Sequence, residues 1–178
     1  KALKAAWPHL DHSDRFVRWA ALAAVQPQPV QKWANRALKE KNYGKRVTLL
    51  LGLAKVTGID PANRQTTDPP LDQAMAKKIF QSLGQVDWDQ LNEEQRLTLV
   101  RTYHVALVRF GKPDKPTTNR IVTQLDPHFP ALTFDQNWLL CETLAFLQAP
   151  STASKAMALL LAAPTQEEQI EYARSLRM

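Results

Sequence analysis

A chain of 178 residues is long enough for one domain with a substantial core or for a run of helical repeats. Its hydrophobic content of 44% is ordinary for a folded protein, which excludes wholesale disorder, and only five glycines favour helices over sheets. No apolar run approaches the roughly 20 residues of a membrane-spanning helix, so we expect no membrane insertion. The single cysteine, Cys141, excludes an internal disulfide, a thiolate metal cage and a CxxCH haem attachment within these residues.

The net charge of +6 is unevenly distributed along the chain. Residues 1–58 contain eleven Lys or Arg against three Asp or Glu, whereas residues 59–178 contain twelve against fourteen. A basic end of this kind suits an acidic partner, a nucleic acid or a neighbouring domain. The chain opens on Lys1 without the pattern of a signal peptide and finishes within a helical pattern. We therefore expect it to be a piece of a longer protein.

The first two predicted helices cover residues 2–9 and 15–25, and the second belongs to the stretch LDHSDRFVRWAALAAV. A leucine, a polar turn, a Val-Arg pair and an alanine-rich helix, in that order, are typical of a HEAT repeat, which is a pair of antiparallel helices that stacks on its neighbours. We expect Ser13 or Asp14 to cap this helix, and Arg18 to reach back to the carboxylates of the turn. The prolines that follow Gln26 end the helix.

Two further helices are predicted over residues 30–40 and 45–57. The second has apolar stripes on two sides, which indicates burial on two sides, and Gly58 ends it. Residues 59–70 contain three prolines and no periodicity. We interpret them as a mobile loop or as a seam between two sub-bundles.

The remaining periodic segments bring the total to about ten helices, or four to five helical pairs. Asn92 is a good N-cap, and Thr133 with Gln136 and Thr165 with Glu168 have the spacing of capping boxes. The remaining helices are predicted over residues 71–83, 92–110, 117–125, 134–147, 154–162 and from 165 onward.

The two halves of the chain contain an internal repeat. A shift of 122 positions superposes apolar residues of 10–25 on apolar residues of 132–147, while Arg18 falls on Leu140. The packing positions therefore repeat, and the charged one does not. The matched pairs are Phe16 with Trp138, Val17 with Leu139, Leu22 with Leu144, Val25 with Leu147, and Gln26 with Gln148.

Basic and aromatic residues are the most prominent candidates for binding. Six cations surround one turn between helices, and those at 32, 36 and 39 share a helical face. One interpretation is a binding surface for phosphate, an anionic polymer or an acidic domain. The other, which we favour, is a solvated outer surface. The five tryptophans could mark nucleic-acid binding. We favour the alternative that they fill gaps between helices. The cations are Lys32, Arg36, Lys39, Lys41, Lys45 and Arg46, and the tryptophans are Trp7, Trp19, Trp33, Trp88 and Trp138.

The other polar candidates do not form a recognisable reaction centre. His9 and His12 have a metal-like spacing but lack the three or four ligands that zinc needs, and His104 is expected to be an interior histidine. The acidic group around Trp88 sits where a helix N-terminus favours negative charge. Neither a serine nor the cysteine has a convincing base and orienting acid. The acidic residues are Asp87, Asp89, Glu93 and Glu94, and the candidate nucleophiles are Cys141, Ser151 and Ser154.

Several phrases together carry a family resemblance over nearly the whole chain. They are AAWPHLDHSDRFVRWAALAAV, VDWDQLNEEQRLTLVRTYHVALVRFGKPD, LDPHFP and LLCETLAFLQAPSTASKAMALLLAAPTQEEQIEYARSLR. The chain resembles the HEAT-like segment of large bacterial haem-binding multidomain proteins, in which a sugar-dehydrogenase-like propeller precedes the helices and a c-type cytochrome domain follows. The resemblance implies an exported, periplasmic protein of an oxidation system, and it implies no catalysis within this segment.

We therefore predict an all-α fold, a single domain that is an α-solenoid of HEAT-like antiparallel helix pairs. The expected function is a non-enzymatic scaffold that holds flanking domains or binds another protein, with no catalytic residue, metal or cofactor in this segment. The alternative is a nucleic-acid-binding solenoid that uses the basic first third. For either partner, the candidate surface comprises Lys32, Arg36, Lys39, Lys45 and Arg46.

Overall fold

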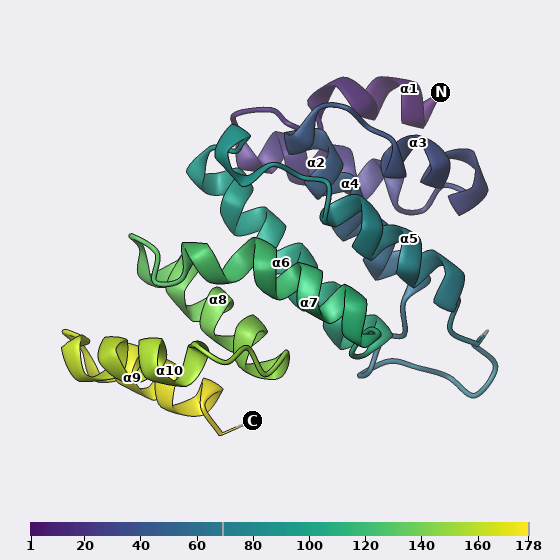
Figure 1. Cartoon of the computed structure of the whole chain (residues 1–178). Helices are drawn as coiled ribbons and strands as arrows, with labels where there is room; N and C mark the ends of the chain where they lie inside the picture. The colour runs from purple at the N-terminus through teal and green to yellow at the C-terminus, as the bar shows by residue number, and fades with distance from the viewer. Residues whose placement is uncertain (69, 178) are drawn as a thin grey trace. The chain divides into compact units, whose positions relative to one another are not determined.

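The computed structural model describes residues 1–68 and 70–177, and these residues are all-α (Figure 1). They form ten α-helices and four short 3-10 helices, without a β-strand. This agrees with the predicted class and with the expected count of about ten helices. The chain divides into two compact units, Lys1–Gly111 and Lys112–Met178. No helix in the described part is long and apolar enough to cross a membrane.

Unit 1 contains six α-helices, most of which begin at a residue that caps them with its side chain. Asp14, Asn42 and Asp72 accept hydrogen bonds from backbone N–H groups in the first turns of α2, α4 and α5. Asn92 and Gln95 form a full reciprocal capping box at the start of α6. The helices are α1 (Ala2–Ala6), α2 (Arg15–Val25), α3 (Ala34–Leu38), α4 (Tyr43–Thr57), α5 (Gln73–Leu83) and α6 (Glu93–Phe110), with 3-10 turns at Trp7–His9, Val30–Lys32 and Trp88–Gln90.

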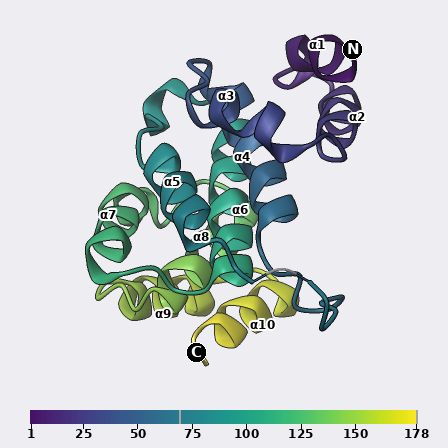
Figure 2. The ribbon, with the colours of Figure 1, turned by 90° about the vertical axis from the view of Figure 1, so that its right-hand side faces the viewer.

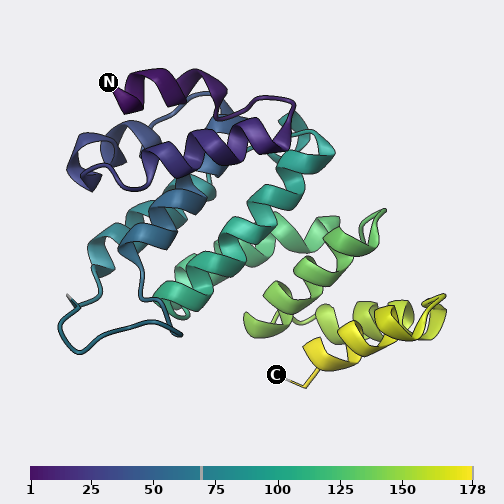
Figure 3. The ribbon, with the colours of Figure 1, turned by 180° about the vertical axis from the view of Figure 1, so that it is seen from behind.

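Helix α4 is the centre of unit 1, with α2 on one side and α5 on the other (Figure 2). Its most extensive contact is with α6, and Figure 3 shows α2, α4 and α6 from behind. Leu49, Leu50 and Leu53 are completely buried, as the two apolar stripes predicted. At Gly52, an added Cβ would lie 2.6 Å from Cδ1 of Leu22, so the absence of a side chain there lets α2 approach α4 closely.

The predicted helix over residues 30–40 is wrong, because its backbone breaks at Trp33. A 3-10 turn covers Val30–Lys32, Trp33 adopts φ −135° and ψ −20°, and α3 covers only Ala34–Leu38. The Trp33 ring is 1% exposed, and its Nε1 donates to the Gln28 carbonyl at 3.2 Å. The burial of this ring and its hydrogen bond compensate for the interrupted helix.

Other helix ends differ by smaller amounts. Helix α1 ends at Ala6, where the chain continues into the 3-10 turn Trp7–His9 that contains Pro8. Helix α4 begins at Tyr43, two residues before the predicted start, since the Asn42 side chain accepts from the Lys45 amide at 2.9 Å.

The irregular segment after Gly58 lies inside unit 1, and so it is not a seam between the units. Its beginning is bound to α6: the Ile59 amide donates to the Arg109 carbonyl at 3.0 Å, and the Arg109 guanidinium pairs with Asp60 at 3.2 Å. The division instead falls after Gly111, where φ is +80°, a conformation that favours glycine. Pro69, one of the prolines in this segment, lies outside the described residues.

Unit 2 has its own core around α8. Leu140, Cys141 and Leu144 of α8 are completely buried, and α8 contacts each of the other three helices of the unit. The units therefore each contain the buried apolar side chains that a folded domain needs. The helices are α7 (Lys115–Leu125), α8 (Phe134–Phe146), α9 (Thr152–Ala162) and α10 (Gln166–Ser175), with a 3-10 turn at Asp126–His128.

Of the two predicted capping boxes in unit 2, the first is wrong, and the second is observed only as its N-cap bond. Thr133 makes no side-chain cap bond. Instead, the Asn137 side chain accepts from the Ala131 amide at 2.6 Å and donates to the Ala131 carbonyl at 3.0 Å, which holds the loop against the first turn. At α10, Thr165 does act as the N-cap, accepting from the Glu168 amide at 3.3 Å.

Candidate interaction surface

Arg18 connects three segments of unit 1 at the start of α2. Its guanidinium donates to the carbonyls of His12 and Ser13, the latter at 3.0 Å, and pairs with Glu94 of α6. The expectation that Arg18 reaches the carboxylates of the turn is therefore wrong, since it binds the carbonyls. The Asp14 carboxylate is already used as the N-cap, where it accepts from the Phe16 amide at 2.7 Å.

A polar pocket of about 140 Å³ lies beside this arginine, between α2, α4 and α6. Its polar groups mainly satisfy one another, as in the Arg18–Glu94 pair and the Asn92–Gln95 capping box. These bonds hold the turn before α2 against the start of α6. The lining residues are Asp11, His12, Ser13, Arg18, Gly44, Val47, Thr48, Asn92, Glu94, Gln95 and Thr98.

The exposed side of α2, called the α2 face below, carries two large apolar side chains. Phe16 and Trp19 are 70% and 65% exposed, and Ala20 and Ala23 on the same side of the helix are exposed as well. The four residues form one stripe along the helix, and the described residues of unit 1 leave both aromatic rings exposed.

The expectation that all five tryptophans fill gaps between helices is wrong for Trp19. Trp7, Trp33 and Trp88 are buried, and Trp138 is partly buried. Trp19 instead lies on the α2 face, where the Lys55 ammonium is 5.2 Å from the centroid of its ring. This distance suits a cation–π contact.

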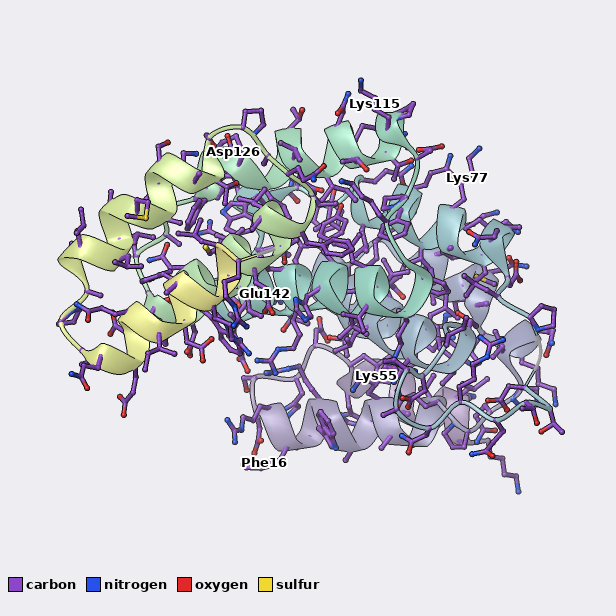
Figure 4. The ribbon with its side chains drawn as sticks, turned by 90° about the horizontal axis from the view of Figure 1, so that it is seen from below. Phe16, Lys55, Lys77, Lys115, Asp126 and Glu142 are labelled. Atoms are coloured by element: carbon purple, nitrogen blue, oxygen red, sulfur yellow. The ribbon has the colours of Figure 1, made fainter. Side chains whose placement is uncertain are left out.

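Lys55 of α4 is in an unusually positive environment. Partial burial lowers the pKa of its ammonium, and the nearby positive charges of Arg109 and Arg101 lower it further. Figure 4 labels Lys55 and Phe16, which come from the neighbouring helices α4 and α2. The α2 face is therefore bordered by positive charge on the α4 side.

The basic residues predicted as a surface are only partly brought together. Arg36 stacks over Trp7, with Cζ 3.8 Å from the ring centroid, and Lys45 pairs with Asp11 at 3.5 Å. Arg46 is 8% exposed and donates to the Glu40 carbonyl. These three cations take part in packing. Lys32, Lys39 and Lys41 are exposed, and so is Arg36 despite its stacking on Trp7.

Glu40 connects this packed group. Its carboxylate accepts from Trp7 Nε1 at 2.8 Å. Although partial burial alone would raise the pKa of Glu40, the bonds from Trp7 and from backbone amides lower it overall. Trp7, backbone amides and the charge of Lys45 thus favour the ionised carboxylate, while Arg46 binds the Glu40 carbonyl.

The histidines and the acidic group contribute local structure. The rings of His9 and His12 are 6.2 Å apart, and His12 Nδ1 accepts from the Asp14 amide at 3.0 Å. His104 is partly exposed. Asp87 caps the turn at Trp88–Gln90, and Glu94 pairs with Arg18. Within residues 1–68 and 70–177, no three or more His, Cys, Asp or Glu side chains are grouped to hold a metal ion.

The candidate nucleophiles lie in unit 2. Cys141 is completely buried, and burial raises the pKa of its thiol to about 11, which leaves it in the unreactive thiol form. Ser151 donates to the Asp126 carboxylate, which Lys155 also contacts at 3.0 Å, and Ser154 donates to the Ser151 carbonyl at 2.9 Å. Asp126 thus connects the turn after α7 to α9.

Sequence reasoning missed Lys55, Arg101 and the pairing of Glu94. These residues come from helices far from Trp19 in the chain, so no spacing within one helix indicates that they meet. One signal was present: Phe16, Trp19, Ala20 and Ala23 form a stripe along one side of the predicted second helix.

Comparisons with protein-family models, with curated proteins and with solved structures find no match to this chain. Its function is therefore inferred from its own residues.

Proposed function

We propose that this chain is a non-enzymatic, HEAT-like helical scaffold that holds flanking domains or binds a protein partner. The observation that carries the proposal is the uncovered α2 face, on which Phe16 and Trp19 are 70% and 65% exposed. Exposed apolar groups of this size on an otherwise packed helix mark interaction sites.

The contacts between helices support the HEAT-like arrangement. In unit 1, α1 packs on α2, α3 on α4 and α5 on α6, while α2 contacts α4 and α4 contacts α6. In unit 2, α7 packs on α8 and α9 on α10. Such nearest-neighbour packing of consecutive pairs is the rule in helical repeat proteins.

The repeated stretch supports the same interpretation. Leu22 and Val25 of α2 are buried in unit 1, and the matching Leu144 and Leu147 are buried in unit 2. Arg18 holds the turn before α2, whereas its counterpart Leu140 is completely buried. The repeat thus preserves the packing positions at Leu22 and Val25, whereas Phe16 is 70% exposed and the matching Trp138 is partly buried.

We further propose, from the family resemblance, that the scaffold belongs to a larger exported haem-binding redox protein and acts in the periplasm. The test is the complete reading frame around this segment. Flanking sequences with a propeller pattern and a CxxCH motif would support this setting, and their absence would contradict it.

The scaffold function is tested by titrating the chain, in a calorimeter, with separately produced domains that the reading frame encodes on either side. We expect saturable binding that Trp19→Ala weakens and Lys77→Glu leaves unchanged. Lys77 is exposed on α5, which lies on the opposite side of α4 from α2 (Figure 2). Substrate turnover by the chain alone, or absence of binding to every flanking domain, would contradict the proposal.

A second candidate function is binding of nucleic acid. Unit 1 contains seventeen Lys or Arg against ten Asp or Glu, and Trp19 is an exposed ring beside a lysine. Binding of an oligonucleotide should weaken steeply with salt, because displaced counterions supply the affinity. Charge reversal at Lys32, Arg36 and Lys45 should abolish this binding. Absence of binding at low salt would remove this candidate.

A further inference from the structure

We propose that the α2 face, which consists of Phe16, Trp19, Ala20 and Ala23, binds an acidic amphipathic α-helix of a partner protein. Lys55 of α4, at the border of this face, takes part in the binding. The inference deepens the proposed scaffold function and rests on it. It names the chemistry of the partner: an apolar stripe bordered by Asp or Glu side chains.

The shape of the face suits a helix. Ala20 and Ala23 place only methyl groups on the exposed side of α2, so the backbone of a second helix can approach closely there. Phe16 and Trp19, which precede the two alanines along α2, are 70% and 65% exposed. Aromatic side chains bury on the order of 150–250 Å² each when covered, so these two rings supply most of the apolar area a partner would cover.

The charges on the face select an acidic partner. The Arg15 guanidinium lies 4.8 Å from the centroid of the Phe16 ring, and the Lys55 ammonium lies 5.2 Å from that of Trp19. Each ring is thus paired with a cation. Partial burial and the positive charges of Arg109 and Arg101 disfavour the ammonium form of Lys55, although Asp60 already pairs with Arg109. A partner carboxylate would stabilise this ammonium. Complementary charge of this kind fixes the partner's register and speeds association.

A polyanion suits the α2 face less well than an acidic helix. Two neighbouring cations are already used inside unit 1, Arg18 by Glu94 and Arg109 by Asp60. The alanines in the middle of the face donate no hydrogen bond to phosphate. Binding of nucleic acid depends on many phosphate contacts along a groove, whereas this face offers an apolar centre with positive charge at its border.

The experiment uses the whole chain and three probes. The first is a synthetic helical peptide of about four turns with Leu and Phe along one side and Glu beside them. The second is the same peptide with Lys in place of every Glu, and the third is a single-stranded oligothymidine. Binding is measured by the change in Trp fluorescence and by calorimetry, for the unmodified chain and for Phe16→Ala, Trp19→Ala, Lys55→Glu and Lys77→Glu, each checked for folding by circular dichroism.

We expect the acidic peptide to bind and the basic peptide to bind at least about tenfold more weakly. Trp19→Ala and Phe16→Ala should each weaken binding of the acidic peptide about tenfold, as expected for central aromatic contacts. Lys55→Glu should reverse the preference between the two peptides, an effect that loss of structure would not produce. Lys77→Glu should change nothing, since Lys77 lies on α5 and away from the α2 face (Figure 4).

Three results would overturn the inference: equal affinity for the two peptides, binding of the acidic peptide that Trp19→Ala and Lys55→Glu leave unaltered, or binding of the oligothymidine alone. The last result would overturn the scaffold proposal as well. If the chain binds a flanking domain in the calorimetric test but neither peptide, the inference fails while the scaffold proposal stands.

Discussion

At the scale of single residues, the tryptophans show how one residue type takes two roles. Trp33 is 1% exposed with its Nε1 bonded to a carbonyl, whereas Trp19 is 65% exposed. Trp33→Ala should therefore lower the free energy of unfolding of unit 1 by about 3–5 kcal/mol, because it leaves a cavity. Trp19→Ala should change it by no more than about 0.5 kcal/mol. Chemical denaturation measures both, and a large loss from Trp19→Ala would contradict the exposed placement.

Asp126 makes the stability of unit 2 depend on pH. Burial alone would raise the pKa of its carboxyl, but the bonds from Ser151 and Lys155 lower it below the ordinary 3.8. The ionised carboxylate therefore stabilises the folded state fully above that ordinary value, and this contribution is lost as the pH falls through the lowered folded pKa. Asp126→Asn should destabilise unit 2 at pH 7 and flatten the fall in its thermal midpoint on acidification.

The matched control for this change is Asp135→Asn, at an exposed carboxylate in the first turn of α8. It should leave the acid-induced fall of the midpoint nearly as steep as in the unmodified chain. If Asp126→Asn and Asp135→Asn have the same effect on the pH profile, the Ser151–Asp126–Lys155 contacts do not control the acid sensitivity.

The α2 face illustrates which part of the candidate site a sequence can predict. The periodicity of residues 15–25 correctly predicted the helix α2. The exposure of Phe16 and Trp19 could not be predicted, because amphipathic periodicity is the same for a covered and an uncovered face. Lys55 could not be predicted either, since its proximity to Trp19 depends on how α2 crosses α4.

At the scale of helices, two glycines at helix ends offer a matched pair. A Cβ on Gly58, after α4, would lie 2.5 Å from Arg109 Cβ and 2.8 Å from the Ala54 carbonyl oxygen. A Cβ on Gly84, after α5, would be 3.4 Å from its nearest neighbour, the Phe80 carbonyl oxygen. Gly58→Ala should therefore destabilise unit 1 by about 1–3 kcal/mol. Gly84→Ala should stabilise it by about 0.4–1 kcal/mol, since alanine restricts the unfolded chain.

Chemical denaturation of the two glycine variants tests this pair. Both variants replace a glycine that follows a helix, so a difference between them reports the space at each site rather than a general effect of alanine. Equal effects of the two substitutions would show that α4 and α6 are not as close at Gly58 as the distances indicate.

The helix boundaries were predictable where a capping side chain or a proline decides them. Asp14 and Asn92 begin α2 and α6 as expected, and Gly58 ends α4. The prediction failed at Trp33, where burial of one ring competes with helical continuity, and at Thr133, where Asn137 satisfies the loop instead. In both places, a contact made by one side chain outweighs the local preference for a continuous helix or for a threonine cap. The spacing of residues in the sequence does not indicate such a contact.

At the scale of the whole molecule, the chain divides after Gly111 and not at the stretch after Gly58, which the sequence left open as a mobile loop or a seam. The proline-rich stretch after Gly58 has the composition of a boundary, but the Arg109 side chain and carbonyl bind its first residues. In the sequence, Gly111 is a weaker indication of a boundary than the proline-rich stretch. In the structure, it adopts φ +80°, and the two units divide directly after it. Composition therefore locates irregular backbone, whereas contacts decide which irregular segment separates units.

The presence of two cores leads to a prediction about cooperativity. Gly58→Ala introduces a clash in unit 1, whereas Leu140→Ala removes a completely buried side chain from α8 in unit 2. A buried Leu→Ala change costs about 2–5 kcal/mol. If each unit unfolds around its own core, calorimetry of the full chain should resolve two transitions, and each substitution should lower the midpoint of only one. Hydrogen exchange should assign the transition that Gly58→Ala moves to Lys1–Gly111 and the other to Lys112–Met178. A single transition that both substitutions lower alike would mean that the chain unfolds as one cooperative unit.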